Sequence, residues 1–229
     1  MLQKNLITDL FFDLDHTLWD FDKNSALTFE QIFKNHQLDV PMDEFIPIYE
    51  EINMAYWKLF REEKISKEAL RRGRLSDSFA ALKRQITTET IDLLAISYID
   101  TLSENNFLFD GAMELLEYLK PKYKLHIITN GFEEVQYKKM KNAKIDRFFD
   151  TITNSEMVGV KKPNPKIFYY ALKNANTSAE KSVMIGDNLE ADIIGAENVG
   201  MQTVFFNYKN QPIDHHISVS HLLEIKNIF

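Results

Sequence analysis

One long helical stretch divides the strand-like segments of this sequence, and that division constrains the fold more than any other feature. The apolar run at Ile7–Phe12 is typical of a buried strand. Strand-like runs return after the break at Asn105-Asn106, where they alternate with helical stretches. This alternation predicts an α/β core with a parallel sheet covered on both faces. The later runs lie at Leu125–Thr129, Thr151–Thr153, Ser182–Ile185 and Thr203–Phe206.

From about Asn24 to Asn105, apolar residues recur at helical spacing, which predicts four consecutive amphipathic helices. Their place directly after the first strand predicts an inserted cap that covers a ligand site. The expected division is a core made of residues 1–20 and 106–229 and a helical cap made of residues 21–105. Aromatic residues of the insert are expected to fill its own core rather than to contact a substrate.

Composition narrows the class of partner. The 229 residues carry a net charge of −7, which argues against binding to nucleic acid or to an anionic membrane and favours a small-molecule ligand. Cysteine is absent, which excludes thiolate metal sites. A chain without cysteine also suits a reducing compartment, where disulfides do not form. No apolar run reaches the roughly 20 residues of a membrane helix, and the first strand leaves no room for a signal peptide. We therefore expect a cytoplasmic protein, with an oligomeric state that the sequence leaves open.

Two carboxylates follow the first strand, at Asp13 and Asp15, and a hydroxyl follows at Thr17. The two-residue period of a strand sends both carboxylates to the same side, where like charges need a cation to be tolerated. Oxygen ligands without cysteine favour Mg²⁺ over zinc. The alternation sends His16 away from the pair, and a solvated acidic turn is the alternative interpretation of the motif.

Three further polar clusters stand at predicted strand ends or loops. Thr129-Asn130-Gly131 offers a hydroxyl, an amide and a close backbone approach to an anion, although Asn-Gly is also a common turn. Lys162 precedes Pro163, ahead of a helix expected to begin near Asn164 or Pro165, and a rigidly held lysine there could bridge phosphate and carboxylates. Asp187 and Asp192 follow another strand, where acidic residues also suit an ordinary helix start.

Taken in chain order, these clusters read Asp-x-Asp-x-Thr (13–17), Thr-Asn-Gly (129–131), Lys-Pro (162–163) and Gly-Asp-x4-Asp (186–192). The ordered set resembles the haloacid dehalogenase (HAD) superfamily over essentially the whole chain, and the insert resembles the helical type 1 cap of that family. The segment at 17–26 and the cap segment at 70–74 are most similar to the branch of YjjG-type pyrimidine 5′-nucleotidases and N-acylneuraminate-9-phosphatases.

The resemblance implies a Rossmann-like core and a Mg²⁺-dependent phosphomonoesterase of small phosphorylated metabolites, with an aspartyl-phosphate intermediate. It implies that Asp13 is the nucleophile and that Asp15, which the namesake dehalogenases lack, is the general acid and then the general base. The implied phosphate-binding residues are Thr129, Asn130, Gly131 and Lys162. The implied Mg²⁺ ligands are Asp13, the backbone carbonyl of Asp15 and Asp187, with Asp192 either binding through water or orienting Lys162.

Substrate choice is expected to lie with the cap. Trp19, Phe21 and Asn24 at the hinge, together with Arg71 and Arg74, are the candidate specificity residues, and an aromatic wall would suit a nucleobase. The alternatives are hinge packing for the aromatic residues and solvated positions for the arginines. A pyrimidine nucleoside 5′-monophosphate is the leading substrate and a sugar or acyl-sugar phosphate the second. A phosphosugar mutase and a binding module without turnover stay open.

Overall fold

The computed structural model describes residues 4–212 and 216–229. The chain forms two compact units, one made of residues 1–20 and 106–229 and the other of residues 21–105. Besides a short 3-10 helix at Leu102–Glu104, the second unit consists of four α-helices, as the helical spacing predicts. They are α1 (Phe21–Asn35), α2 (Met42–Arg61), α3 (Lys67–Ala81) and α4 (Thr88–Thr101).

Aromatic rings fill the core of the helical unit. The ring of Phe29 lies 4.9 Å from that of Phe45, 4.4 Å from that of Tyr49 and 4.7 Å from that of Tyr98, measured between centroids. These rings come from α1, α2 and α4, so one aromatic cluster joins three helices. Ser66 and Thr87 cap α3 and α4, each accepting a hydrogen bond from a backbone N–H of the first turn. The aromatic stripes therefore serve as bundle core, as expected.

The other unit is built on a six-stranded sheet in the order β3-β2-β1-β4-β5-β6, and every neighbouring pair is parallel. Because β1 lies between β2 and β4, strand order reverses beside it, where open α/β sheets bind ligands. The bounds are β1 Asp9–Phe12, β2 Lys124–Thr129, β3 Thr151–Asn154, β4 Ser182–Gly186, β5 Gln202–Phe206 and β6 Ser218–Val219. The prediction of an α/β core with a helical insert is confirmed.

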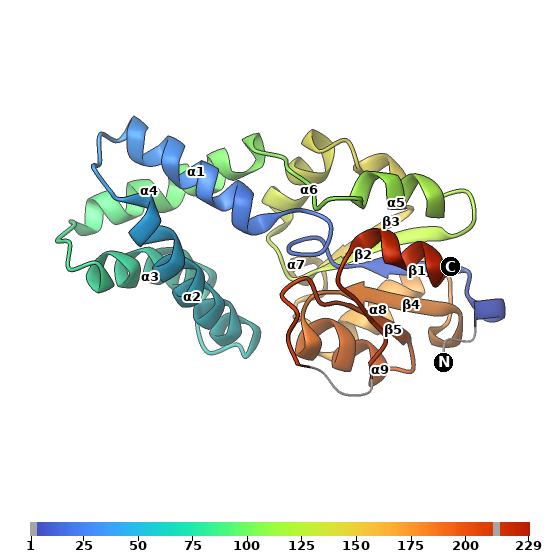
Figure 1. The fold of residues 1–229 in the computed structure, drawn as a ribbon. Helices are drawn as coiled ribbons and strands as arrows, with labels where there is room; N and C mark the ends of the chain where they lie inside the picture. The colour runs from blue at the N-terminus through green and yellow to red at the C-terminus, as the bar shows by residue number, and fades with distance from the viewer. Residues whose placement is uncertain (1–3, 213–215) are drawn as a thin grey trace. The chain divides into compact units, whose positions relative to one another are not determined.

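Helices cover both faces of this sheet, with α5 (Ala112–Leu119) and α6 (Glu133–Asn142) on one side and α8 (Pro165–Ala175) and α9 (Gly195–Glu197) on the other (Figure 1). The short α7 (Ser155–Val158) follows β3, and a π-helical turn at Leu189–Ile194 precedes α9. Helix α8 begins at Pro165, as the predicted start near Asn164 or Pro165 allows, and the Asn164 side chain caps it. Among the described residues, no helix combines the length and the hydropathy needed to cross a membrane.

At the amino end of the sheet, a buried polar chain links three strands. His126 Nε2 lies 3.0 Å from Asp9 Oδ1, and His126 Nδ1 lies 2.9 Å from the Thr151 hydroxyl. Thr8 and Thr177 donate to Asp9 Oδ2 at 2.6 and 2.8 Å. Since a carboxylate accepts, Nε2 carries the imidazole hydrogen and Nδ1 accepts from Thr151 in the neutral ring. Burial lowers the pKa of His126, and the hydrogen bond to Asp9 opposes this effect without cancelling it.

This chain predicts a pH-dependent stability. A histidine whose pKa is lower in the folded than in the unfolded protein binds fewer protons when folded, so stability decreases as pH falls below about 6.5. The contribution of His126 to the free energy of unfolding changes with pH by at most about 1.4 kcal/mol per pH unit. We expect the wild-type free energy of unfolding to fall more steeply than that of His126→Gln between pH 7 and 5. Denaturant titrations of both proteins at each pH measure the difference, and parallel slopes would contradict this role of His126.

Candidate active site

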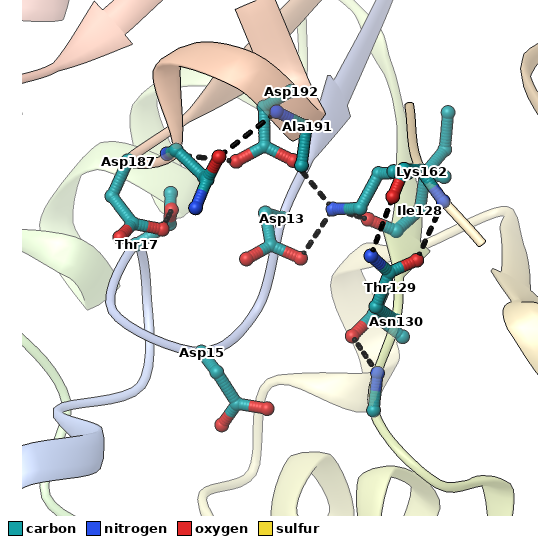
Figure 2. Close-up of polar contacts among 12 residues, drawn as sticks. Asp13, Asp15, Thr17, Ile128, Thr129, Asn130, Lys162, Asp187, Ala191 and Asp192 are labelled. Atoms are coloured by element: carbon teal, nitrogen blue, oxygen red, sulfur yellow. Dashed lines mark hydrogen bonds and ion pairs between the residues drawn. The ribbon is translucent and has the colours of Figure 1, made fainter. Parts of the chain in front are cut away.

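Three strands of the sheet deliver polar side chains to one place. Asp13 directly follows β1, with its backbone N–H bonded to Ile185 O of β4 at 2.9 Å. Thr129 is the last residue of β2, and Asp187 directly follows β4. Lys162 reaches the same place from the loop between α7 and α8 (Figure 2). The four sequence clusters therefore meet at the carboxyl edge of the sheet, beside the strand where its order reverses.

Lys162 is the centre of the cluster and is 2% exposed. Its Nζ lies 2.7 Å from Asp13 Oδ1, 2.6 Å from Asp192 Oδ1 and 2.7 Å from Ile128 O. Burial alone would lower the pKa of Lys162, but the carboxylates of Asp13 and Asp192 outweigh it and raise the pKa above its ordinary value. Lys162 is therefore a fixed ammonium that points at the Asp13 carboxylate.

Asn130 holds the backbone of Lys162. Its Oδ1 accepts from Lys162 N at 2.7 Å, and its Nδ2 donates to Lys162 O at 3.0 Å. A peptide N–H and a carbonyl of one residue are thus both bonded to a single amide side chain. The sequence interpretation offered either the side chain or the backbone N–H of Asn130 to phosphate. In this structure the side chain of Asn130 is engaged in orienting the backbone of Lys162.

Three carboxylates lie close together here, and one oxygen atom from each of Asp13, Asp187 and Asp192 lies within 4.8 Å of the other two. Burial raises the pKa of Asp13 to about 7 although Lys162 opposes the shift, and burial with the charges of Asp192 and Asp13 raises that of Asp187 well above its usual range. One ammonium against three carboxylates leaves excess negative charge. An all-oxygen donor set with excess negative charge fits a hard divalent cation.

Asp192 is held on both of its oxygens. Oδ1 pairs with Lys162, and Oδ2 accepts from Asn188 N at 3.0 Å. Gly186 makes room for this carboxylate, because a Cβ at that position would lie 2.3 Å from Asp192 Oδ2. Thr17, predicted only as part of the first motif, donates to Asp187 Oδ1 at 3.3 Å. These contacts favour the orienting alternative for Asp192.

Asp15 lies apart from the other carboxylates, and its side chain points away from them (Figure 2). The prediction that Asp13 and Asp15 point to the same side is therefore wrong, because β1 ends at Phe12 and the strand period does not extend to them. Its oxygens accept from Lys139 Nζ at 2.6 Å and from Gln136 Nε2 at 2.8 Å, both on α6. Sequence reasoning missed these two residues. Their three-residue spacing on the helix that follows Thr129-Asn130-Gly131 was the available signal. His16 lies away from the acidic cluster, with Nδ1 3.1 Å from the Tyr208 hydroxyl.

The candidate specificity residues are mostly buried. Trp19 is 0% exposed, and Lys139 Nζ lies 4.1 Å from the centre of its ring, which favours packing over an open stacking face. In the helical unit, Phe21 and Asn24 are buried on α1 and Arg71 is half-buried on α3. The guanidinium of Arg74 is not solvated. It donates to Asn53 Oδ1 at 2.8 Å and lies 4.9 Å from the ring of Tyr98.

Residues 10–206 match the family model of haloacid dehalogenase-like hydrolases. The chain belongs to this family. The HAD-hydrolase YfnB of Bacillus subtilis is 33% identical to this chain over 89% of this chain and 85% of its own length. Its magnesium-bound crystal structure superimposes on this structure with a TM-score of 0.88 and 30% identity, and the match covers 97% of this chain and 98% of YfnB.

Two further relatives of this HAD hydrolase differ from each other in substrate. The pyrimidine 5′-nucleotidase YjjG of Escherichia coli is 32% identical over 89% of this chain and 88% of its own. A glyceraldehyde 3-phosphate phosphatase of Pyrococcus abyssi is 35% identical over 89% of this chain and 82% of its own. The comparisons thus confirm the family and the similarity to the YjjG group, and they divide between nucleotides and a triose phosphate.

Proposed function

We propose that this HAD hydrolase is a Mg²⁺-dependent phosphomonoesterase of small metabolites. The observation that carries the proposal is the Lys162 ammonium, which is fixed 2.7 Å from Asp13 and 2.6 Å from Asp192 at the end of the central strand. Cationic groups held where phosphoryl charge develops supply most of the catalysis in phosphoryl transfer. Family membership and the phosphatases among the relatives support the same reaction class.

In the first step, a carboxylate oxygen of Asp13 attacks phosphorus. A bond forms between that oxygen and phosphorus, the ester P–O bond breaks, and the leaving oxygen takes a proton from Asp15. In the second step, Asp15 takes a proton from water as the water oxygen attacks phosphorus. The bond to Asp13 breaks, inorganic phosphate leaves, and both aspartates return to their starting states.

Lys162 and the Thr129 hydroxyl face the phosphoryl oxygens in this scheme, and Asn130 acts by fixing Lys162. When bound, Mg²⁺ supplies positive charge beside the same oxygens. Asp13, Asp187 and the backbone carbonyl of Asp15 would hold it, while Asp192 keeps Lys162 in place. The magnesium-bound YfnB structure supports this assignment of the metal.

The leading substrate of the proposal is a pyrimidine nucleoside 5′-monophosphate, supported by the 32% identity to YjjG. The second is a sugar or triose phosphate. The Pyrococcus abyssi relative and the buried ring of Trp19, which presents no open face for a base, favour this second candidate. Phe21, Asn24, Arg71 and Arg74 are the residues that we propose select the leaving group, and Trp19 is left out of this set because its ring is buried against Lys139.

A phosphate-release screen tests both levels of the proposal. We expect release from at least one phosphomonoester with Mg²⁺ and a loss of about 100-fold or more with EDTA, because the metal supplies several kcal/mol of charge stabilisation. We expect kcat/KM for UMP to exceed that for glyceraldehyde 3-phosphate by about 10-fold or more. The reverse order would replace the substrate and keep the reaction. Phosphate that migrates within a sugar without release would indicate a mutase.

A further inference from the structure

Two side chains of α6 hold the carboxylate of Asp15. Asp15 lies in the loop after β1, where its side chain is 21% exposed and has two rotatable bonds. Each carboxylate oxygen nevertheless has its own donor, Lys139 Nζ on Oδ1 at 2.6 Å and Gln136 Nε2 on Oδ2 at 2.8 Å. Two donors from one helix fix the plane of the carboxylate as well as its position, which a single hydrogen bond cannot do.

Gln136 also binds the phosphate-site hydroxyl. Its Nε2 lies 2.7 Å from Thr129 Oγ1, and a primary amide nitrogen has two hydrogens, one for Asp15 and one for Thr129. Since a carboxylate accepts only, the nitrogen rather than the oxygen of the amide must face Asp15. The glycine at position 131 permits this approach, because a Cβ there would lie 2.1 Å from Gln136 Nε2.

The hydrogen bonds of Thr129 direct its proton. Oγ1 accepts from Gln136 Nε2 and also from Gly131 N at 3.0 Å. A hydroxyl has two acceptor lone pairs and one donor hydrogen, so both acceptor sites are occupied and the hydrogen is left to donate. A phosphoryl oxygen accepts and never donates. Gln136 therefore orients the Thr129 hydroxyl so that its hydrogen can be donated to a phosphoryl oxygen.

Lys139 is itself held in one place. Its side chain is 3% exposed, and its ammonium lies between the Asp15 carboxylate and the ring face of Trp19, 4.1 Å from the ring centre. A cation over an indole face gains electrostatic attraction, and more where water is excluded. This gives the buried ring of Trp19 a definite task, which is to fix the ammonium that fixes Asp15.

We propose that Gln136 and Lys139 are positioning residues of the phosphatase reaction. Lys139 orients Asp15, the general acid and base. Gln136 binds both Asp15 and the phosphate-binding hydroxyl of Thr129, and so fixes the distance and orientation between these two groups. The inference rests on the proposed function. The two residues have different roles. Loss of Lys139 should disturb proton transfer alone, whereas loss of Gln136 should disturb both proton transfer and phosphate binding.

The first experiment uses Lys139→Met, with Lys138→Met as a matched control on the exposed face of the same helix and Asp15→Ala as a reference. We expect Lys139→Met to lower kcat for an alkyl phosphate by about 10–100-fold, because a displacement of about 1 Å can cost 100-fold. The rate of the pre-steady-state burst of p-nitrophenolate from p-nitrophenyl phosphate should change by less than about 3-fold, since that leaving group needs little protonation. Asp15→Ala should show the same pattern more strongly, and Lys138→Met should match wild type.

The second experiment uses Gln136→Met and the inhibition constant of inorganic phosphate. We expect this constant to rise about 10-fold in Gln136→Met, since Thr129 Oγ1 then keeps only the Gly131 N–H as a donor and its hydrogen is no longer directed to phosphate alone. It should be unchanged in Lys139→Met. Thermal unfolding of each variant identifies any that fails to fold, and Gln136→Met carries the test alone if Lys139→Met is that variant.

Two results would overturn the inference. One is that Lys139→Met lowers kcat for the alkyl phosphate and the burst rate for p-nitrophenyl phosphate by the same factor, which would indicate a structural role. The other is an unchanged phosphate inhibition constant in folded Gln136→Met. If the wild-type protein releases phosphate and either result is obtained, this inference fails and the proposed function stands. If the wild-type protein releases no phosphate from any ester with Mg²⁺, both fail.

Discussion

Asp13→Asn is expected to lower phosphatase activity by at least about 1,000-fold, because an amide oxygen is a poor nucleophile and removal of a single nucleophile can cost as much as removal of a whole catalytic group. The protein should stay folded. Lys162 retains its contacts with Asp192 and Ile128 O, and the backbone N–H of residue 13 keeps its bond to Ile185 O. Initial rates of phosphate release measure the loss, and near-wild-type release from folded Asp13→Asn would exclude an aspartyl-phosphate mechanism.

The same variant has an expected signature in stability. The pKa of Asp13 is raised to about 7 in the folded protein, chiefly by burial, so the metal-free folded state binds more protons than the unfolded state between about pH 4 and 7. Wild-type stability in EDTA should therefore fall as pH rises through that window, and Asp13→Asn should lack this part of the fall. We expect Asp13→Asn to have the higher Tm in EDTA at pH 8, with the difference shrinking towards pH 4.

Lys162→Met is expected to lower kcat by about 100–1,000-fold, the usual cost of removing one fixed donor from a site of developing charge. It should also destabilise the metal-free protein by about 3–5 kcal/mol, since Asp13 and Asp192 would be left buried without their ammonium. Mg²⁺ should restore part of this stability and little of the activity. The two effects are measured by steady-state rates and by denaturant titrations with and without Mg²⁺.

Lys161→Met is the matched control for that variant. Lys161 precedes Lys162 in the sequence, and the three contacts of Nζ with Asp13, Asp192 and Ile128 O belong to Lys162. We expect Lys161→Met to keep activity within about 3-fold of wild type. Loss of activity in Lys161→Met together with retention in Lys162→Met would reverse the assignment of the two lysines and remove the observation on which the proposed function depends.

Polar residues at strand ends were the predictable part of the site. A parallel sheet brings the carboxyl ends of its strands to one edge, so Asp13, Thr129 and Asp187 could be placed together once the strands were recognised. Lys162 was harder, because it comes from a loop. The six-stranded sheet was predicted except for β6, where Ser218–Val219 is too short to show an alternating pattern.

Side-chain direction was the part that the sequence could not provide. Asn130 could equally bind phosphate or the chain, and contacts with Lys162 from a loop about thirty residues later decide between them. Gln136 and Lys139 lie on a helix rich in lysine and glutamate, where most such residues face solvent. Which of them turn inward depends on how α6 is rotated against the sheet, and that rotation follows from tertiary packing rather than from local pattern.

The position of β1 at the centre of the sheet has a consequence for how the protein is made. β1, which Asp13 directly follows, is translated before both of its partners, because β2 and β4 come after the helical insert in the sequence and Asp9 pairs with Lys124 and Ser182. All four helices of the insert are complete before either partner strand has been translated. Asp13 can therefore be set in place only after β4 has been translated, so a nascent chain that ends before β4 cannot carry the assembled site.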